Sequence, residues 1–410
     1  MRALFQINLF LILLLSCLHA NAQYYKTLPK GVRLLNTRYI KSNISSSFNR
    51  SKSESPYQYE IQADTQQLES INNQTLNDAL EVLQEYPEAY DKFTLGTHKL
   101  DANADVNVEV LGFAYGISSQ VTAYVGIPIY QAHVKLNYSR PQDSTQQEVA
   151  QILQSEYGDN WAQTVGNILE KIYQIDQAAI QSTLVNHYGY QELGDWNGTG
   201  LGDIELGFMY NFKETKTYGL KSTIGFIAPT GYTDDPDLIQ DIGFGDGQWD
   251  IFFEFGSGIR VADNTYFNIW SRYTYQMETT KELRVPYDED IFISSEKTTF
   301  REKLGNQIEL NLNLGHALND WFTLTPELNF NFTEAATYSS DHHEANDILA
   351  MNTESYSQNF KIAANFSSIE LFQKNSFLLP AQLNLSYQTM LTGKNTPKVD
   401  LLEIDFRLFF

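Results

Sequence analysis

Cysteine is nearly absent from this chain of 410 residues, which contains only Cys17. A single thiol excludes a disulfide framework and a zinc site built from cysteines. Basic residues are also scarce, because 28 Lys and Arg stand against 50 Asp and Glu, giving a net charge of -22. Such a chain lacks the basic face that neutralises phosphates, so no nucleic-acid partner is expected. Beyond residue 22, no apolar run is long enough for a membrane-spanning helix.

Apolar and aromatic side chains are plentiful by contrast. Hydrophobic residues make up 42% of the chain, with 25 Tyr, 25 Phe and 5 Trp, whereas charged residues make up only 19%. This composition excludes a disordered chain and is sufficient for a large core. Taken alone, with a mean hydropathy of -0.35, it indicates an acidic soluble protein, but the order of the residues indicates a different class.

Residues 1–22 have the features of a secretory signal peptide. Arg2 supplies the positive charge, residues 7–18 are mostly apolar, and Ala20 to Ala22 form a small-residue cleavage site. We therefore expect the mature chain to begin at residue 23 and to be exported. A lipoprotein is the alternative, because the residues before Cys17 loosely resemble a lipobox.

Long segments of the mature chain alternate between apolar and polar residues. In 307–314, for example, Ile308, Leu310, Leu312 and Leu314 share one face, and polar residues share the other. Strands of soluble sandwiches also alternate, but they average about 5 to 6 residues. These segments run to about 10 or more residues, which is the length that a tilted strand needs to cross a bilayer.

The connections between these segments alternate between short and long. Tight polar turns lie at 116–119, 213–217, 262–265 and 316–320, and long polar segments separate them. Bacterial outer-membrane barrels have short periplasmic turns and long outer loops. The sequence therefore predicts an all-β fold, a transmembrane antiparallel up-and-down β-barrel of about twelve strands in the outer membrane of a Gram-negative cell. The expected spans are 32–48, 96–115, 120–138, 201–212, 218–230, 249–261, 266–276, 299–315, 321–335, 357–367, 377–391 and 399–410.

The last expected strand alternates up to its final residue, Phe410. This ending looks like the signal by which the barrel assembly machinery recognises its clients. Aromatic residues near other strand ends, such as Tyr115, Trp321 and Phe322, suit a girdle at the interface with outer-membrane lipid.

Residues 23–94 are expected to hold the first strand and a long loop, or a plug plus a short strand, ahead of a barrel at 95–410. Helical periodicity at 74–86 and within 140–200 predicts short helices in the extracellular loops. In the strand at 120–138, the apolar residues change parity after Ile129. A slip of one residue exchanges the two faces of a strand, so we expect a bulge or kink between Pro128 and Gln131.

Charged residues fall on the face that would point into the barrel. Pairing the strands around the turn at 262–265 sets Arg260 against Tyr266, Gly256 against Trp270, and Glu254 against Arg272 in an expected ion pair. The inward face also includes Asp105 and Glu109. Such charges either line a passage or fill the interior with salt bridges that hold the wall together. The candidates for lining the lumen are Glu205, Lys221, Asp250, Glu254, Trp270, Arg272, Glu309 and Glu327.

Catalytic and metal-binding motifs are not found in the sequence. There is no nucleophile elbow, phosphate loop or metalloprotease helix motif. The acidic loop 231–247 lacks the spacing of a calcium loop, and His342 and His343, in a strand-like segment, would point in opposite directions. We therefore expect neither an enzyme nor a cofactor nor a metal.

Three glycine-rich segments, Gly200 to Gly207, Pro229 to Gly231 and Gly243 to Gly247, resemble the outer-membrane barrel family named for the meta-pathway of phenol degradation. Tyr115 to Ser118 and Gly393 to Pro397 are also similar to that family, which lies in the group of hydrophobic-compound transporters that includes the fatty-acid channel. The resemblance covers roughly 95–410, and it identifies no catalytic residues.

The resemblance implies a channel for passive uptake of small hydrophobic or aromatic compounds, with a small hydrophobic ligand as its cargo. The alternative is an outer-membrane barrel that does not transport and instead binds a partner or ligand through its extracellular loops.

Overall fold

The computed structural model describes residues 26–65, 68, 74–139, 143–158, 165–173, 177–287 and 293–410. The expected signal segment, 1–22, lies outside the described residues. Contacts divide the chain into two units, one of residues 1–56, 103–135 and 195–410, and the other of residues 57–102 and 136–194. In the described ranges, no helix combines the length and the apolar character needed to span a bilayer.

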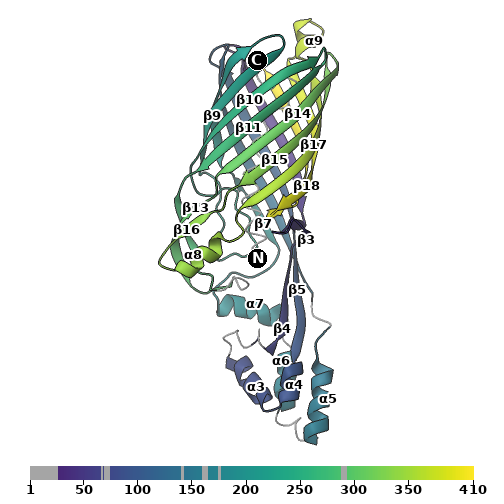
Figure 1. The fold of residues 1–410 in the computed structure, drawn as a ribbon, viewed down its shortest axis with the longest axis vertical. Helices are drawn as coiled ribbons and strands as arrows, with labels where there is room; N and C mark the ends of the chain where they lie inside the picture. Colours follow the sequence, from purple (N-terminus) through teal and green to yellow (C-terminus); the bar gives the residue numbers. More distant parts are fainter. Residues whose placement is uncertain are drawn as a thin grey trace. The chain divides into compact units, whose positions relative to one another are not determined.

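The first unit is built around a closed antiparallel barrel of twelve strands (Figure 1), as the alternation predicts. Around the wall the order is β5-β1-β20-β18-β17-β15-β14-β11-β10-β9-β8-β6, and pairing of β5 with β6 closes the barrel. The strands are β1 (Arg33–Ile44), β5 (Thr94–Gly116), β6 (Val121–Ser139), β8 (Ile204–Glu214), β9 (Tyr218–Ala228), β10 (Asp250–Ala262), β11 (Thr265–Gln276), β14 (Gln307–Asn319), β15 (Phe322–Thr333), β17 (Ser355–Ser367), β18 (Ala381–Lys394) and β20 (Asp400–Phe409).

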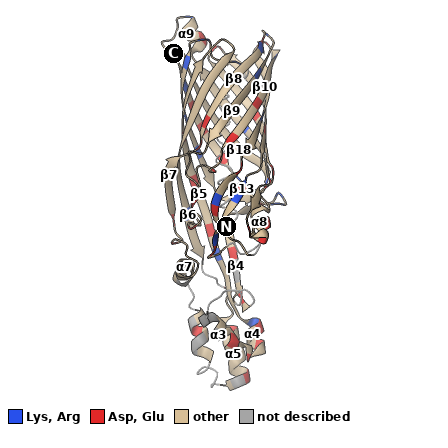
Figure 2. Ribbon diagram, turned by 90° about the vertical axis from the view of Figure 1, so that its left-hand side faces the viewer, with Lys and Arg blue, Asp and Glu red and all other residues tan. Residues whose placement is uncertain are grey.

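Alternation explains why these segments form the wall. Side chains of one parity face outward and are largely apolar, as with Phe208, Ile224 and Phe253, while most of the opposite parity is buried and polar. The first and last strands are joined by pairing of Leu34 with Phe409 through Asn43 with Asp400. In Figure 2, acidic and basic residues are interspersed along the strands of the barrel.

Three of the expected strands are each divided in the structure. The segment 32–48 forms β1 and, in a separate sheet, β2 (Ser46–Phe48). The segment 299–315 forms β13 (Lys297–Lys303) and β14, and β13 joins β12 (Thr279–Arg284) and β16 (Thr337–Ser339) in a separate sheet. Gly305 lies at this break, where an added Cβ would come within 1.7 Å of the Glu334 carbonyl oxygen. Only a glycine allows that approach, so the chain bends there instead of continuing as one strand.

The third divided segment is 201–212, where β7 (Trp196–Leu201) precedes β8. On β6, Gly126 pairs with Glu205 and Ile129 pairs with Leu201, so the partner carries one extra residue at Gly202–Asp203. The irregularity expected between Pro128 and Gln131 therefore lies on the opposite strand. Even-numbered residues of β6 stay buried from Thr122 to Val134, so the change of apolar parity after Ile129 does not exchange the two faces of this strand.

Helices occur in both ranges where the periodicity predicts them, 74–86 and 140–200. In the second unit, α3 (Gln74–Gln84), α4 (Pro87–Lys92), α5 (Gln146–Tyr157), α6 (Asn167–Tyr173) and α7 (Gln177–Asn186) accompany β4 (Gln58–Asp64). Leu80, Leu83, Phe93, Val149 and Leu153 belong to one buried core, so this unit holds its apolar helix faces within itself. The first unit adds α8 (His343–Ala350), α9 (Ile369–Gln373) and a small sheet of β2, β3 (Glu54–Pro56) and β19 (Thr396–Pro397). The helices α4, α8 and α9 are additional to those that the periodicity predicts.

Candidate functional site

The barrel interior holds all eight side chains that the sequence marks as candidates for lining the lumen. Each is at most 6% exposed, and each lies on the buried parity of its strand. They come from β8, β9, β10, β11, β14 and β15, so they occupy one side of the wall. Their role in a passage stays a prediction. The candidates are Glu205, Lys221, Asp250, Glu254, Trp270, Arg272, Glu309 and Glu327.

The register predicted around the turn at 262–265 is confirmed. Arg260 pairs with Tyr266, Gly256 with Trp270, and Glu254 with Arg272. The Arg272 Nε atom lies 3.4 Å from Glu254 Oε1, so the expected ion pair is present. Register in a hairpin follows from the turn and from the parity of the strands, which is why local sequence suffices to predict it.

Arg272 also makes a contact that no local pattern predicts. Its Nη2 atom donates to Glu205 Oε2 at 2.7 Å, although β9 and β10 lie between β8 and β11 in the wall. Glu205 accepts a second hydrogen bond from the Tyr124 hydroxyl at 2.6 Å. The Arg272 guanidinium carbon lies 3.7 Å from the centre of the Phe252 ring, within the range of a cation–π contact. These side chains span the interior from β6 to β11.

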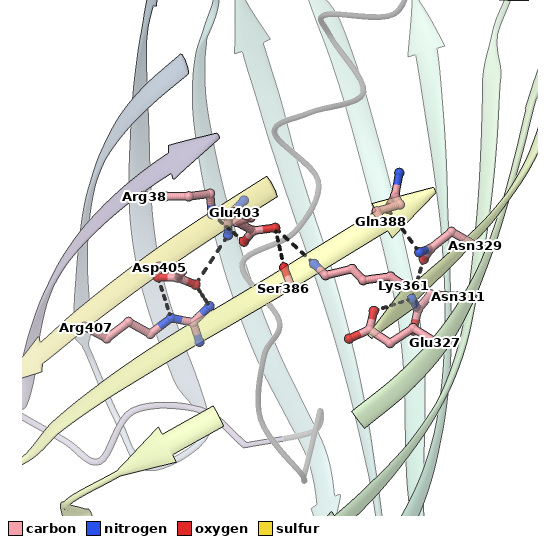
Figure 3. Close-up of polar contacts among 10 residues, drawn as sticks. All are labelled: Arg38, Asn311, Glu327, Asn329, Lys361, Ser386, Gln388, Glu403, Asp405 and Arg407. Atoms are coloured by element: carbon pink, nitrogen blue, oxygen red, sulfur yellow. Dashed lines mark hydrogen bonds and ion pairs between the residues drawn. The ribbon is translucent and has the colours of Figure 1, made fainter. Parts of the chain in front are cut away.

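A second cluster, shown in Figure 3, joins the first strand to the last. Arg38 Nε lies 3.3 Å from Glu403 Oε1, and Arg407 Nη2 lies 2.7 Å from Asp405 Oδ2. Lys361 from β17 reaches Glu403 Oε2 at 3.0 Å. In the sequence, Asn36 and Arg38 interrupt the apolar pattern of the first strand. The structure explains them, because both face inward and contact carboxylates of β20.

Amide side chains fill the wall between these two clusters. Asn268 donates to Asn313 at 2.8 Å, Asn313 donates to Asn311 at 2.7 Å, and Asn311 donates to Glu327 at 3.1 Å. Asn329 continues this chain of contacts toward Gln388 (Figure 3). Most buried polar groups in this part of the interior are therefore paired with each other, as burial away from water requires.

The wall made by β1 and β5 has the opposite character. Many of its inward residues are apolar, namely Ile40, Ile44, Val106, Val108 and Val110, each at most 4% exposed, although Asn36, Arg38 and Ser42 of β1 share the same buried face. Ile40 is paired with Val108 across the two strands. We call these five residues the apolar sector.

Asp105 and Glu109 do not face inward as the sequence analysis expected; both are exposed on the outward face of β5. Asn43 of β1 donates to Asp105 Oδ1 at 2.9 Å, and Tyr39 donates to Asn107 at the same distance. Around Asp105 and Glu109 the outward side chains of β5 are polar and the inward side chains are apolar, which is the reverse of most of the barrel. Assigning the polar side chains of every strand to the inside therefore misplaces these two carboxylates.

The glycine-rich segments pack against each other where β7 and β8 are interrupted. Asp203 accepts hydrogen bonds from the backbone N–H groups of Gly231 at 2.8 Å and Asp246 at 3.1 Å. A Cβ at position 245 would lie 2.4 Å from Asp203 Oδ1, which explains why glycine stands there. The Phe244 ring stacks on Tyr130 with centroids 5.2 Å apart. The loop 229–249 is thereby fixed to the wall.

Burial raises the pKa values of two carboxyl groups of this loop, which makes them weaker acids than usual. It raises the pKa of Asp241 to about 7 although the Tyr232 hydroxyl and the Asp235 N–H donate to this carboxylate. Burial together with the charge of Asp203 raises the pKa of Asp246 to about 7. Asp237, by contrast, is paired with two cations: its Oδ1 lies 2.6 Å from Arg284 Nη2, and its Oδ2 lies 2.8 Å from Lys297 Nζ. The acidic loop is thus a folded part of the protein. It is held by hydrogen bonds within the loop and by ion pairs with Arg284 and Lys297.

His342 and His343 lie at the start of a helix and not in a strand. His342 is the N-cap of α8, and His343 is its first residue. His342 Nε2 lies 3.5 Å from Glu296 Oε1. The two histidines therefore do not lie in the strand-like segment that the sequence predicts.

These features define a closed outer-membrane-type barrel with an interior that is charged on one side and apolar on another. No protein-family model matches the chain, and no curated protein sequence does. Among solved structures, an outer membrane channel from Pseudomonas putida F1 aligns with a TM-score of 0.53 and 13% identity, over 96% of this chain and 100% of that one. The two chains share the fold.

Two further solved structures align less well. A FadL homologue from Pseudomonas aeruginosa gives a TM-score of 0.36 at 7% identity, over 95% of this chain and 92% of that chain. The Ralstonia pickettii toluene transporter TbuX gives 0.35 at 8% identity, over 93% of this chain and 90% of that chain.

Sequence reasoning missed three features of this interior. The contact between Arg272 and Glu205 and the contacts of Arg38 both depend on which strands face each other, and no spacing in the sequence reports that. The apolar sector did leave a signal, because Val106, Val108 and Val110 form an uninterrupted apolar parity.

Proposed function

We propose that this chain is an outer-membrane channel for the passive uptake of small hydrophobic or aromatic compounds. The twelve-strand barrel with an apolar outer face suits a bilayer, and the fold shared with an outer membrane channel supports this placement. In this proposal the end with the short turns faces the periplasm, and the long connections face outward. No catalytic step is assigned to the chain.

The apolar sector is the observation that carries the proposal. A water-filled pore has a polar interior, because ions and sugars exchange part of their hydration for polar side chains. Here Ile40, Ile44, Val106, Val108 and Val110 present an apolar patch inside the wall, with Ser42 as the polar residue within it. Apolar solutes gain free energy by leaving water for such a surface. The ion pairs on the other side hold the wall together without being required to bind the solute.

Uptake measurements test this function. Cells that lack the chain and cells that express it are given a panel of aromatic compounds, fatty acids and sugars of similar size. We expect expression to accelerate uptake of the aromatic or aliphatic members and to leave the sugars unchanged. Equal rates across the whole panel would contradict transport, and faster entry of sugars would point to a general polar pore.

A second candidate function is binding of a partner or ligand through the long extracellular loops, without transport. The second unit favours it, because its helices enclose a core of their own and thus form a folded body. Leu83→Asp would place a charge in that core, where Leu83 is fully buried. If uptake is the function, this variant should still transport once its barrel is shown to be folded; if binding is the function, the variant should lose it.

A further inference from the structure

The connection between β17 and β18, residues 368–380, differs from the other turns at the same end of the barrel. The turns after β5, β8, β10 and β14 have four residues or fewer, whereas this connection has room for the helix α9. In Figure 1, α9 stands at the end of the barrel where the C-terminus lies. We call residues 368–380 the α9 turn.

The α9 turn exposes a run of large apolar side chains. Phe377, Leu378 and Leu379 are 54%, 90% and 56% exposed, and Phe372 of α9 is 41% exposed. Such a run is costly in water, and contiguous exposed apolar side chains mark interaction surfaces. The run lies outside the strands, so the alternation of the barrel wall does not account for it.

The backbone of this turn is held in place by hydrogen bonds. The Ser368 carbonyl accepts from Phe372 N–H at 2.8 Å, and Ser368 Oγ accepts from Ala381 N–H at 2.9 Å. The Ser368 hydroxyl donates to the Leu379 carbonyl at 2.5 Å. The exposed side chains are therefore carried by a fixed loop whose two ends meet.

The exposed run continues the aromatic girdle of the outer wall. Phe366, the last outward residue before the turn, stacks on Phe322 with centroids 4.9 Å apart and on Trp321 at 6.0 Å. Trp321 is 45% exposed on the outer side. Aromatic girdles sit at the level of the lipid headgroups, so the α9 turn begins at the membrane interface itself.

Charge also favours a lipid phase over a charged partner. Glu370 and Lys374 are the only charged residues of the α9 turn, and Lys374 Nζ lies 3.9 Å from Glu370 and also pairs with Asp320. The turn is thus neutral in a chain whose net charge is -22. A surface that recruits a charged protein would offer unpaired charge, and this one offers Phe and Leu.

We propose that the α9 turn is a membrane anchor, whose residues Phe372, Phe377, Leu378 and Leu379 insert into the periplasmic phospholipid leaflet beside the barrel. The anchor would hold β17 and β18 against the lipid at one fixed point of the rim. This proposal rests on the proposed function, which places the barrel in the outer membrane. The anchor adds a lipid contact that the strands do not make.

Site-directed labelling tests the anchor. The mature chain expected from residue 23 contains no cysteine, so an environment-sensitive fluorophore can be attached specifically to Leu378→Cys. The folded protein is placed in nanodiscs of phosphatidylethanolamine and phosphatidylglycerol. Asp263→Cys, in the polar turn after β10, serves as the control for water. Ile404→Cys, on the outward face of β20, serves as the control for lipid. Each probe is measured with lipids brominated near the glycerol end of the acyl chain, and with aqueous iodide.

We expect the probe at position 378 to behave like the probe at position 404, with blue-shifted emission, quenching by the brominated lipid and protection from iodide. Quenching by iodide to the extent seen at position 263 would overturn the anchor and assign the patch to a protein in the periplasm. Failure of the probe at position 404 to meet lipid would contradict the membrane placement itself, so the two failures are distinguishable.

Discussion

Arg272 on β11 and Glu205 on β8 form a buried ion pair at 2.7 Å across the barrel, with two strands between them in the wall. Glu254 and Tyr124 complete the cluster, so one guanidinium balances two carboxylates. A barrel wall alone holds neighbouring strands together. This contact instead ties together strands that are not neighbours.

Replacing Arg272 by Met should destabilise the barrel strongly. The substitution keeps much of the side-chain volume but leaves Glu205 and Glu254 buried without their cation, and breaking a buried pair in this way costs about 3–5 kcal/mol. Urea unfolding in micelles, followed by the heat-dependent shift of the folded band in gels, measures the loss. The matched control is Arg301→Met, because Arg301 pairs with Glu278 at the exposed surface. We expect this control to change stability by less than about 1 kcal/mol.

Gly245→Ala should release the loop 229–249. The new Cβ would lie 2.4 Å from Asp203 Oδ1, and the carboxylate cannot move away without losing its hydrogen bonds to Gly231 and Asp246. Overpacking of this kind costs about 1–3 kcal/mol. Chymotrypsin should then cut near Phe244, which is 3% exposed in the folded loop. Gly126→Ala is the control, since nothing lies within 4 Å of its added Cβ. Equal resistance of both variants would show that the loop does not depend on this contact.

The same loop should loosen as the pH rises. Burial raises the pKa of Asp241 to about 7, above the value of about 3.9 for an unfolded chain. A carboxyl group with a raised pKa stabilises the folded loop fully below about pH 4, and that stabilisation is lost as the pH rises to about 7. Chymotrypsin cleavage at pH 5 and pH 8 checks this, with Asp241→Asn measured at each pH to correct for the protease. The wild type should gain sensitivity relative to the variant, and a constant ratio would exclude Asp241 as the titrating group.

Val108→Thr should impair uptake of apolar solutes without altering the wall. The side chains have nearly the same shape, but a buried hydroxyl without a partner costs about 1–3 kcal/mol. If solutes pass along the apolar sector, uptake of aromatic compounds should fall by about fivefold or more. Leu111→Thr changes the outward face of the same strand, where Leu111 is 46% exposed, and should transport as the wild type does. Equal rates in both variants would move the passage away from this sector.

Phe410→Ala should reduce assembly of the barrel in cells. The final aromatic residue is expected to carry the signal for the assembly machinery, and the Phe410 N–H donates to the Arg33 carbonyl at 3.0 Å where the two terminal strands meet. The folded fraction in the outer membrane is measured from the heat-dependent gel shift. Leu402→Ala is the matched control, since Leu402 is exposed on the same strand. A loss confined to Phe410→Ala after export, with normal refolding in detergent, would assign the effect to recognition and not to stability.

The sequence by itself determined the wall of this protein. Strand number and the pairing of Glu254 with Arg272 both follow from a period of two residues and from short turns, which are local properties of the chain. The helices at 74–86 and within 140–200 follow in the same way from their apolar stripes.

Only the tertiary structure decided what the interior contains. Glu205 meets Arg272, and Arg38 meets Glu403, because the closed barrel brings together strands that are far apart along the chain. The break at Gly305 and the extra residue at Gly202–Asp203 depend on close approaches that no spacing in the sequence records. The outward position of Asp105 and Glu109 likewise depends on what surrounds each face. Alternation shows that a strand has two faces, but the assignment of each face comes from the packing of the folded chain around it.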